Sequence, residues 1–232
     1  MPHKYSGILK LVGLLEDLDA DALEVIGRCC GWKFYPAQEQ IIDRQSESTD
    51  VFFVIEGGVR VVNYSVSGRE ITLDDIDQGG HFGELAAIDG EPRLASVMSL
   101  TPCRVATLSQ DYFVEMVHNY PSVAFKVMRD LAAVVRNSTE RVMDLSTLAA
   151  NIRVQADLLR LATNNMVDRE KASISPIPVH SDVASRVSTS RETVARVMND
   201  LARQGIVDRQ KDALIISNVK LLRQMVEKVR GD

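Results

Sequence analysis

The chain of 232 residues has little cysteine, few aromatic side chains and no long apolar run. Its three cysteines, Cys29, Cys30 and Cys103, are too badly spaced for a C-x-x-C metal or redox site, and their odd number fits a reducing compartment. No stretch approaches the roughly 18 apolar residues that a membrane-spanning helix needs, and the N-terminus lacks a secretion-signal pattern. We therefore expect a cytoplasmic protein with ordinary thiols.

Motifs of the common enzyme classes are also missing from the sequence. There is no Walker phosphate-binding loop, no nucleophile with a neighbouring base and no cluster with metal-ligand spacing. A nucleotide-regulated enzyme is the competing hypothesis from another functional class, and these absences argue against it. We therefore expect no catalytic residue, no metal site and no prosthetic group.

The charge is distributed unevenly along the chain. Hydrophobic residues make up 45% of the sequence and charged residues 25%, enough for one large or two modest globular domains. The net charge is -5, but residues 152–232 carry 14 Lys or Arg and 10 Asp or Glu, a balance of +4. Residues 1–151 carry 13 Lys or Arg and 22 Asp or Glu, a balance of -9. This asymmetry permits a basic C-terminal part that contacts nucleic-acid phosphates.

Short strands dominate the N-terminal half. Residues 8–30 are predicted to form short helices, and from Trp32 the pattern changes to β-rich runs separated by glycine and proline turns. Strands this short and evenly spaced favour an antiparallel barrel or jelly roll. The predicted strands are 32–35, 40–43, 51–55, 59–64, 70–73, 96–100 and 104–108.

Residues 81–96 interrupt the strands and carry chemistry of their own. Residues 82–88 can form a helical turn whose N-terminal amides, freed by Gly83, favour an anion. Arg93 follows a proline on an extended segment and can give a charge-assisted pair to a phosphate. Glu84 is then an acceptor for a sugar hydroxyl beside that phosphate. Phosphate and ribose together imply a nucleotide.

A long helix is predicted from Ser122 to about Ile152, with apolar residues on a heptad frame. A helix of this length, on the order of 45 Å, favours packing against a second helix, although packing on its own chain is the alternative. Ser138 lies on the seam and Thr139 follows it, so these hydroxyls either set the register or meet a ligand. The seam positions are Met128, Leu131, Val135, Ser138, Val142, Leu145 and Ala149.

The C-terminal region has the pattern of a winged helix-turn-helix. The predicted elements are a helix at 153–166, a loop at 168–178, helices at 181–187 and 190–204, wing strands at 206–209 and 213–216, and a final helix at 218–229. The second of the paired helices has a polar face long enough to reach base edges, formed by Arg191, Glu192, Ala195, Arg196 and Asn199. Thr189 with Glu192 also fits a capping box, which is the alternative role for that glutamate.

Two motifs identify a family resemblance. The run F-G-E-L-A-x(4)-E-P-R-x-A-S resembles the phosphate-binding cassette of cyclic-nucleotide-binding domains, and S-R-E-T-V-A-R is similar to a recognition helix of the cyclic AMP receptor protein (Crp/Fnr) family. The whole chain resembles that family. The resemblance implies the fold class α+β, with a cyclic-nucleotide-binding jelly roll at 1–121, a dimerisation helix and hinge at 122–151, and a winged helix-turn-helix at 152–232. It places the hinge at about 147–151.

The same resemblance implies roles for individual residues. For the cyclic nucleotide, Glu84 holds the ribose 2'-hydroxyl and Arg93 holds the cyclic phosphate. The amides of Gly83 to Leu85 and of Leu94 bind the remaining phosphate oxygens. Ser138 and Thr139 contact the adenine. Leu94 departs from the family, which usually has a small or hydroxylated residue there. For DNA, Arg191 and Arg196 read guanines, Glu192 reads a cytosine amino group, and Ser181, Ser190 and Thr193 contact phosphates.

The expected function is that of a homodimeric transcription regulator that binds cyclic AMP and then an inverted repeat with TGTGA-like half-sites, acting with RNA polymerase. A response to cyclic GMP, or to another small effector, remains open, and so does a cassette that folds but binds nothing. An iron–sulfur sensor needs an N-terminal cysteine cluster that this chain lacks. The histidines suggest no pair of haem ligands: His3, His81, His118 and His180.

Overall fold

Burial along strand β3 (Val51–Glu56) reveals the layers of the N-terminal part of the molecule. The structure is a computed structural model that describes residues 4–230, so His3 lies outside the described residues. Successive side chains of a strand point to opposite faces. Val51, Phe53 and Ile55 pack into a cluster with the N-terminal helices, whereas Phe52 and Val54 pack into a second cluster shared by two sheets. β3 is therefore buried on both faces.

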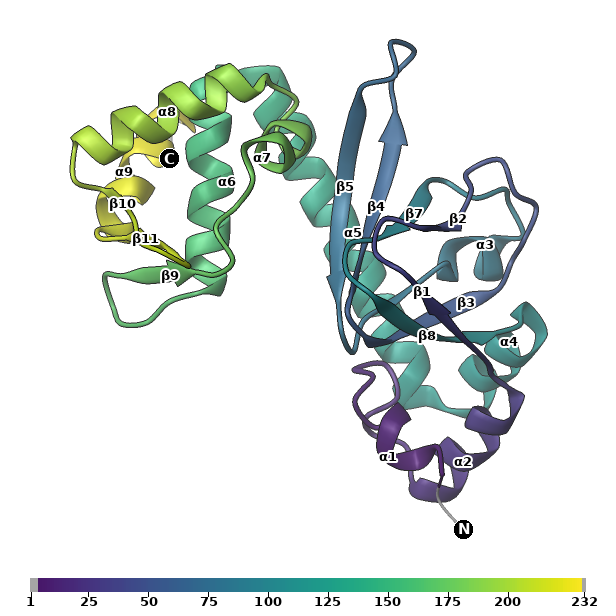
Figure 1. Ribbon diagram of the computed structural model, residues 1–232. Coiled ribbons are helices and arrows are strands. Elements are labelled where there is room, and N and C mark those ends of the chain that lie inside the picture. The colour runs from purple at the N-terminus through teal and green to yellow at the C-terminus, as the bar shows by residue number, and fades with distance from the viewer. Residues whose placement is uncertain (1–3, 231–232) are drawn as a thin grey trace. The chain divides into compact units, whose positions relative to one another are not determined.

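Eight strands form two four-stranded sheets in which every pairing is antiparallel. One sheet has the order β1-β8-β3-β6 and the other β2-β7-β4-β5, and the β4–β5 hairpin extends beyond the other strands (Figure 1). The prediction of a β-rich antiparallel N-terminal domain is confirmed. The remaining strands are β1 (Gly31–Tyr35), β2 (Gln40–Ile42), β4 (Gly58–Tyr64), β5 (Glu70–Asp77), β6 (His81–Phe82), β7 (Ser96–Ser99) and β8 (Cys103–Leu108).

Helices cover the outer face of the first sheet. α1 (Ser6–Leu9) and α2 (Ala20–Cys29) occur where short helices were predicted, and α4 (Gln110–Asn119) was not predicted. Phe113 and Met116 of α4 are buried in the same cluster as β3. One local prediction was wrong, because Phe82 belongs to β6, where it pairs with Phe52 and stacks on its ring at 4.9 Å, and the helix α3 begins only at Glu84 (Glu84–Asp89).

The predicted long helix is two helices. α5 spans Pro121–Thr147 and α6 spans Ala150–Asn164, so the prediction of one helix to Ile152 was wrong at its end. Ala149 is extended at the break, Leu148 is buried, and the guanidinium of Arg153 donates to the carbonyl oxygen of Leu148 at 2.8 Å. The break lies inside the segment predicted as a hinge.

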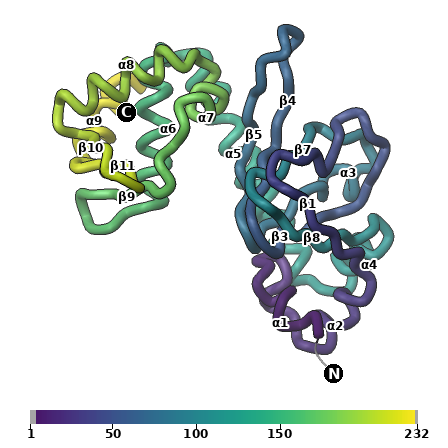
Figure 2. Tube along the Cα trace, in the orientation of Figure 1, coloured from purple at the N-terminus to yellow at the C-terminus, as the bar shows by residue number. Residues whose placement is uncertain are grey.

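The chain divides into two compact units, Met1–Val134 and Val135–Asp232. The second unit contains a three-stranded sheet and helices that pack around one core. α7 (His180–Arg186) and α8 (Arg191–Arg203) form the predicted helix-turn-helix, and β10 (Val207–Arg209) and β11 (Leu214–Ile216) form the wing (Figure 2). α9 (Val219–Arg230) packs on α6. The predicted loop at 168–178 contains a strand, β9 (Ala172–Ile174), because Ala172 and Ile174 are buried and pair with β11.

Among the described residues, no helix is both long and apolar enough to cross a membrane. Over the same residues, no group of three or more His, Cys, Asp or Glu side chains is arranged to hold a metal ion.

Candidate functional site

Gly83 is required by the geometry of the cassette between β6 and β7. Its φ of +89° is a left-handed conformation that glycine adopts without strain. A Cβ atom at this position would lie 2.7 Å from the carbonyl oxygen of Asp50 and 2.8 Å from Nη1 of Arg93. Gly83 precedes α3, whose first amides have no partner within the helix and are available to a ligand. The helix thus begins two residues later than the predicted turn, with Gly83 at its N-cap.

Arg93 lies inside the cassette rather than on its surface. Only 5% of the residue is exposed. Its guanidinium donates to the carbonyl oxygens of Gly83 (2.8 Å) and Asp50 (2.7 Å), and through Nε and Nη2 to the hydroxyl of Ser48 (3.2 Å each). Burial lowers the pKa of Arg93, and the negative charges of Asp50 and Glu84 oppose that shift. The side chain is thus a cation held at the base of the cassette.

Sequence reasoning missed Ser48 and the Asp50 carbonyl group as partners of Arg93. Both lie more than 40 positions away in the sequence, since the separations are 45 and 43 residues. No local motif marks them. The contact exists because the segment before β3 passes beside the cassette.

The other predicted residues of the cassette lie near this cation along the chain. Glu84 and Leu85 open α3 and are partly exposed, and Glu84 is close enough for its charge to act on Arg93. Leu94 is 64% exposed, and its carbonyl oxygen accepts from the carboxamide of Asn63 at 3.3 Å. The cassette therefore brings Gly83, Glu84, Leu85, Arg93 and Leu94 together, with a side-chain cation and a side-chain anion adjacent.

The residues present fit a cyclic phosphate ester next to a ribose, with one adjustment. A guanidinium has five N–H donors, and four of them are used in the contacts to Gly83, Ser48 and Asp50. One Nη1 donor is available without any rearrangement. A bidentate contact with phosphate needs Arg93 to exchange its Ser48 contacts for the ligand.

Ser138 and Thr139 lie on α5, and both are exposed. The hydroxyl of Thr139 donates to the carbonyl oxygen of Val135 at 2.9 Å, whereas Ser138 makes no side-chain hydrogen bond within residues 4–230. The same helix exposes large apolar side chains at predicted seam positions, with exposed fractions of 57% for Met128, 64% for Val135 and 60% for Val142. These three seam positions are exposed and form an apolar stripe, whereas the predicted seam position Leu131 packs against the core of the first unit.

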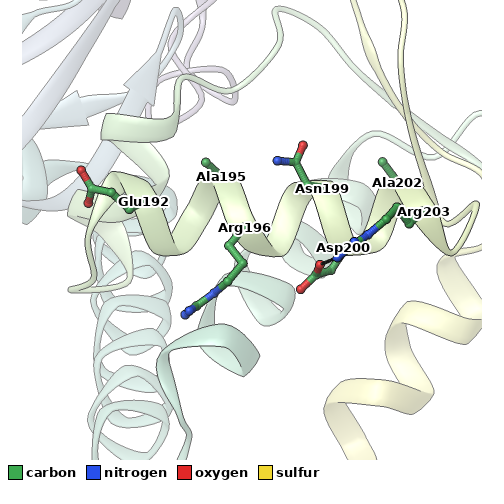
Figure 3. A pocket seen from close by; sticks show the side chains of 7 residues that line it. All are labelled: Glu192, Ala195, Arg196, Asn199, Asp200, Ala202 and Arg203. Carbon is green, nitrogen blue, oxygen red and sulfur yellow. Dashed lines mark hydrogen bonds and ion pairs between the residues drawn. The ribbon is translucent and has the colours of Figure 1, made fainter.

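The polar face of α8 is exposed as predicted. Val194, Val197, Met198 and Leu201 are buried in the core of the second unit. This burial turns the opposite face of the helix outward, where Arg191, Glu192, Arg196 and Asn199 are exposed. Figure 3 shows a shallow depression on this face, lined by Glu192, Ala195, Arg196, Asn199, Asp200, Ala202 and Arg203.

The cap of α8 differs from the predicted capping box. The N-cap residue is Ser190, whose hydroxyl accepts from the amide of Thr193 at 3.3 Å, so Thr189 does not cap the helix. Glu192 is exposed, and its hydrogen bond with the Ser190 hydroxyl lowers its pKa. Ser181 donates to Asp182 at 3.1 Å. Of the predicted phosphate contacts, Ser190 therefore has a structural role at the helix end, and Thr193 lies beside it.

A set of charged contacts that sequence reasoning missed holds α7 and α8 in place. Arg153 of α6 donates to the carbonyl oxygens of Val187 (2.9 Å) and Ser188 (3.1 Å) in the turn of the helix-turn-helix. Asp157, one turn along α6, pairs with Arg186 of α7 at 2.9 Å, and their side chains are 5% and 13% exposed. These contacts fix α7 and the turn before α8 to α6.

Two family models match the chain. The first, the cyclic nucleotide-binding domain, matches residues 32–120, and the second, the Crp-like helix-turn-helix domain, matches residues 153–225. Together they cover more than half of the sequence, and each match contains one of the two sites.

Curated relatives match most of the chain at low identity. The "cAMP-activated global transcriptional regulator CRP" of Salmonella typhimurium is 24% identical over 183 residues, which cover 78% of this chain and 87% of that protein. The "CRP-like cAMP-activated global transcriptional regulator" of Mycobacterium tuberculosis is 23% identical over 216 residues, or 93% and 96% of the two chains.

Solved structures share the fold. A mutant of CooA from Carboxydothermus hydrogenoformans matches with a TM-score of 0.80 and 18% identity, covering 93% of this chain and 95% of that one. The c-di-GMP responsive global regulator CLP of Xanthomonas campestris matches with a TM-score of 0.72 and 19% identity, covering 86% and 100%. With a cyclic-nucleotide-binding domain and a Crp-like helix-turn-helix domain in one sequence, this chain belongs to the Crp/Fnr family of transcription regulators.

Proposed function

We propose that the protein is a homodimeric transcription regulator that binds cyclic AMP in the cassette and reads an inverted repeat in DNA with α8. One observation carries the proposal: the buried cation Arg93 and the anion Glu84 lie together at a glycine turn with free amides. A cation and amides suit a phosphate, whereas a carboxylate suits a ribose hydroxyl. The two relatives from Salmonella typhimurium and Mycobacterium tuberculosis are named as cAMP-activated regulators, which supports cyclic AMP as the ligand.

In the bound state Arg93 pairs with the cyclic phosphate and Glu84 accepts from the ribose 2'-hydroxyl. The amides of Gly83, Leu85 and Leu94 hold the remaining phosphate oxygens. The cyclic nucleotide is an allosteric ligand, and the proposal assigns no prosthetic group, metal or catalytic residue to the chain.

The apolar stripe on α5 pairs with the same stripe of a second copy. Met128, Val135 and Val142 are exposed and have the heptad spacing of a two-helix seam. Burying these apolar side chains against a second copy would lower the free energy of the dimer. Ser138 and Thr139 lie on this helix and contact the adenine. A ligand that contacts the paired helices stabilises one dimer geometry over another, which couples nucleotide binding to DNA binding.

On DNA, Arg191 and Arg196 each donate to a guanine, and Glu192 accepts from a cytosine amino group. Thr193, Ser181 and Ser190 approach phosphates, which position the helix without specifying sequence. The expected half-site resembles TGTGA. RNA polymerase is the expected protein partner, and the DNA target places the protein in the cytoplasm.

The test combines ligand binding and DNA selection on the full-length protein. Calorimetry with cyclic AMP and with cyclic GMP identifies the ligand. Selection from random duplexes, with and without each nucleotide, then identifies the site. We expect cyclic AMP to bind and to be required for enrichment of a two-fold symmetric motif. A motif without two-fold symmetry, or equal enrichment without any ligand, would refute the cyclic-AMP-gated dimer.

A second candidate is a family member that responds to cyclic GMP or another small effector, or that acts without a ligand. The observation that favours it is Arg93, whose donors are largely used by Gly83, Ser48 and Asp50. Exposed Leu94, which has no side-chain hydroxyl for a phosphate, points the same way. Calorimetry showing no cyclic AMP binding, together with DNA selection that needs cyclic GMP or no ligand at all, would favour this candidate.

A further inference from the structure

Asn199 of α8 is exposed and makes no side-chain hydrogen bond within residues 4–230. Asparagine is a weaker helix former than alanine, so an unpaired asparagine in the interior of an exposed helix face reduces stability slightly. Both donors and the acceptor of the carboxamide are available to a partner outside the chain. By contrast Arg203, further along the same face, is ion-paired with Asp200.

Asn199 shares one narrow face with the residues proposed to read DNA. Glu192, Ala195, Arg196 and Asn199 have the spacing i, i+3, i+4 and i+7, which at 3.6 residues per turn places them within an arc of about 100°. Figure 3 shows Ala195 and Asn199 projecting from the same edge of α8. Homeodomain recognition helices present side chains to the major groove with this same spacing.

The distance along the helix also suits a further base pair. Seven residues at ~1.5 Å each separate Glu192 from Asn199 by about 10 Å, close to three base-pair steps of ~3.4 Å. A helix lying in the major groove can therefore place both side chains on base edges of one half-site. Ala195 between them is small enough to allow a close approach and suits contact with a thymine methyl group.

The chemistry of the side chain identifies the base. An asparagine carboxamide can donate to N7 and accept from the N6 amino group of adenine at the same time, a match that no other base offers in the major groove. We propose that Asn199 reads an adenine in each half-site, about three base pairs from the pair that Glu192 reads. This inference rests on the proposed DNA-reading role of α8 and adds a specificity-determining residue to it.

The test is selection from random duplexes by the full-length protein with cyclic AMP, with cyclic GMP and without a nucleotide, followed by affinity measurements on the enriched site. We expect the wild-type motif to contain an adenine within this span. Asn199→Ala should lose about 5-fold to 150-fold discrimination at that one position and keep the others. The side chain of Asn199→Asp has the same shape but can only accept hydrogen bonds, so this variant should prefer cytosine instead of adenine at that position.

Asn164→Ala is the matched control, because Asn164 is an exposed asparagine at the C-terminal end of α6 and is not part of α8. It should leave the motif unchanged. The inference is overturned if Asn199→Ala keeps every base preference, or weakens all sequences alike as a phosphate contact would. A wild-type protein that enriches no motif in any condition would instead overturn the proposed function, and the inference with it.

Discussion

At the residue scale, the cassette depends on a cation that also holds the protein together. Arg93 bonds to two backbone carbonyl groups and to Ser48, so its side chain stabilises the turn at Gly83 as well as offering charge to a ligand. The F-G-E-L-A-x(4)-E-P-R-x-A-S motif predicted the charge. It did not predict that most donors of this arginine are engaged within the protein.

Replacing Arg93 by alanine should therefore change both ligand binding and stability. Loss of a charged hydrogen bond costs about 1.5 to 3 kcal/mol, so cyclic AMP affinity in calorimetry should fall at least tenfold. The carbonyl oxygens of Gly83 and Asp50 lose their donor, so the unfolding temperature should also fall. Ser48→Ala is the control, because it removes the hydroxyl but keeps the cation and should retain binding. Unchanged cyclic AMP binding by Arg93→Ala would contradict the cassette assignment.

Gly83 and Gly90 form a matched pair for a second residue-scale prediction. Both have positive φ, +89° and +72°, so either change to alanine introduces backbone strain of about 1 kcal/mol or more. Only at Gly83 would the new Cβ meet the Asp50 carbonyl oxygen and Arg93, because nothing lies within 4 Å at Gly90. Gly83→Ala should abolish cyclic AMP binding in calorimetry, and Gly90→Ala should preserve it. Equal losses in both variants would mean that strain alone, not the close approach, matters.

At the element scale, the position of the recognition helix depends on charged contacts from α6. The buried pair of Asp157 and Arg186 joins α6 to α7, and Arg153 holds the turn between α7 and α8. Hydrophobic periodicity predicted both helices of the helix-turn-helix. It contains no signal for these contacts, because the partners are about 30 residues apart in the sequence.

Asp157→Asn should strongly destabilise the second unit. Removing one charge of a buried pair leaves the other uncompensated, at a cost of about 3 to 5 kcal/mol. Asp200→Asn is the control, since Asp200 pairs with the exposed Arg203 and such surface pairs contribute only about 0 to 1 kcal/mol. Urea unfolding monitored by circular dichroism measures both free energies. Similar small losses in the two variants would show that burial of the Asp157 pair has no energetic consequence.

The hydroxyls of α5 provide a second element-scale prediction. Ser138→Ala and Thr139→Ala should each weaken cyclic AMP binding relative to cyclic GMP, and should reduce the ligand-dependent gain in DNA affinity. The dimer should persist, because the apolar stripe is unchanged. Calorimetry and sedimentation make the two measurements, with Ser146→Ala, an exposed serine on the same helix, as the control. Monomerisation by either change would indicate that the hydroxyls act on helix register alone.

At the scale of the whole molecule, a dimer with one recognition helix per subunit imposes a fixed spacing on its DNA. The two half-sites of the inverted repeat should lie one helical turn apart, about 34 to 36 Å centre to centre. Inserting about half a turn between them rotates one half-site to the opposite side of the duplex and should abolish high-affinity binding in gel-shift titrations. A protein that tolerates this insertion would not be reading the site as a symmetric dimer.

Local pattern was enough to predict the elements and both motifs. Alternation and glycine turns predicted the strands, the 3.6-residue period predicted α8 with its exposed polar face, and the cassette motif predicted a cyclic-nucleotide-binding domain. These features depend on neighbours in the sequence, which is why a single sequence contains them.

Contacts between distant segments decided the rest. The break at Leu148, the strand at Ala172–Ile174, the inward orientation of Arg93 and the support from Arg153 and Asp157 each require a partner far along the chain. An unpaired buried polar group costs free energy, so each buried donor needs an acceptor nearby. That acceptor comes from a distant part of the sequence and is determined only when the layers pack. The residue types of both sites were therefore present in the sequence, and their working geometry came from the packed structure.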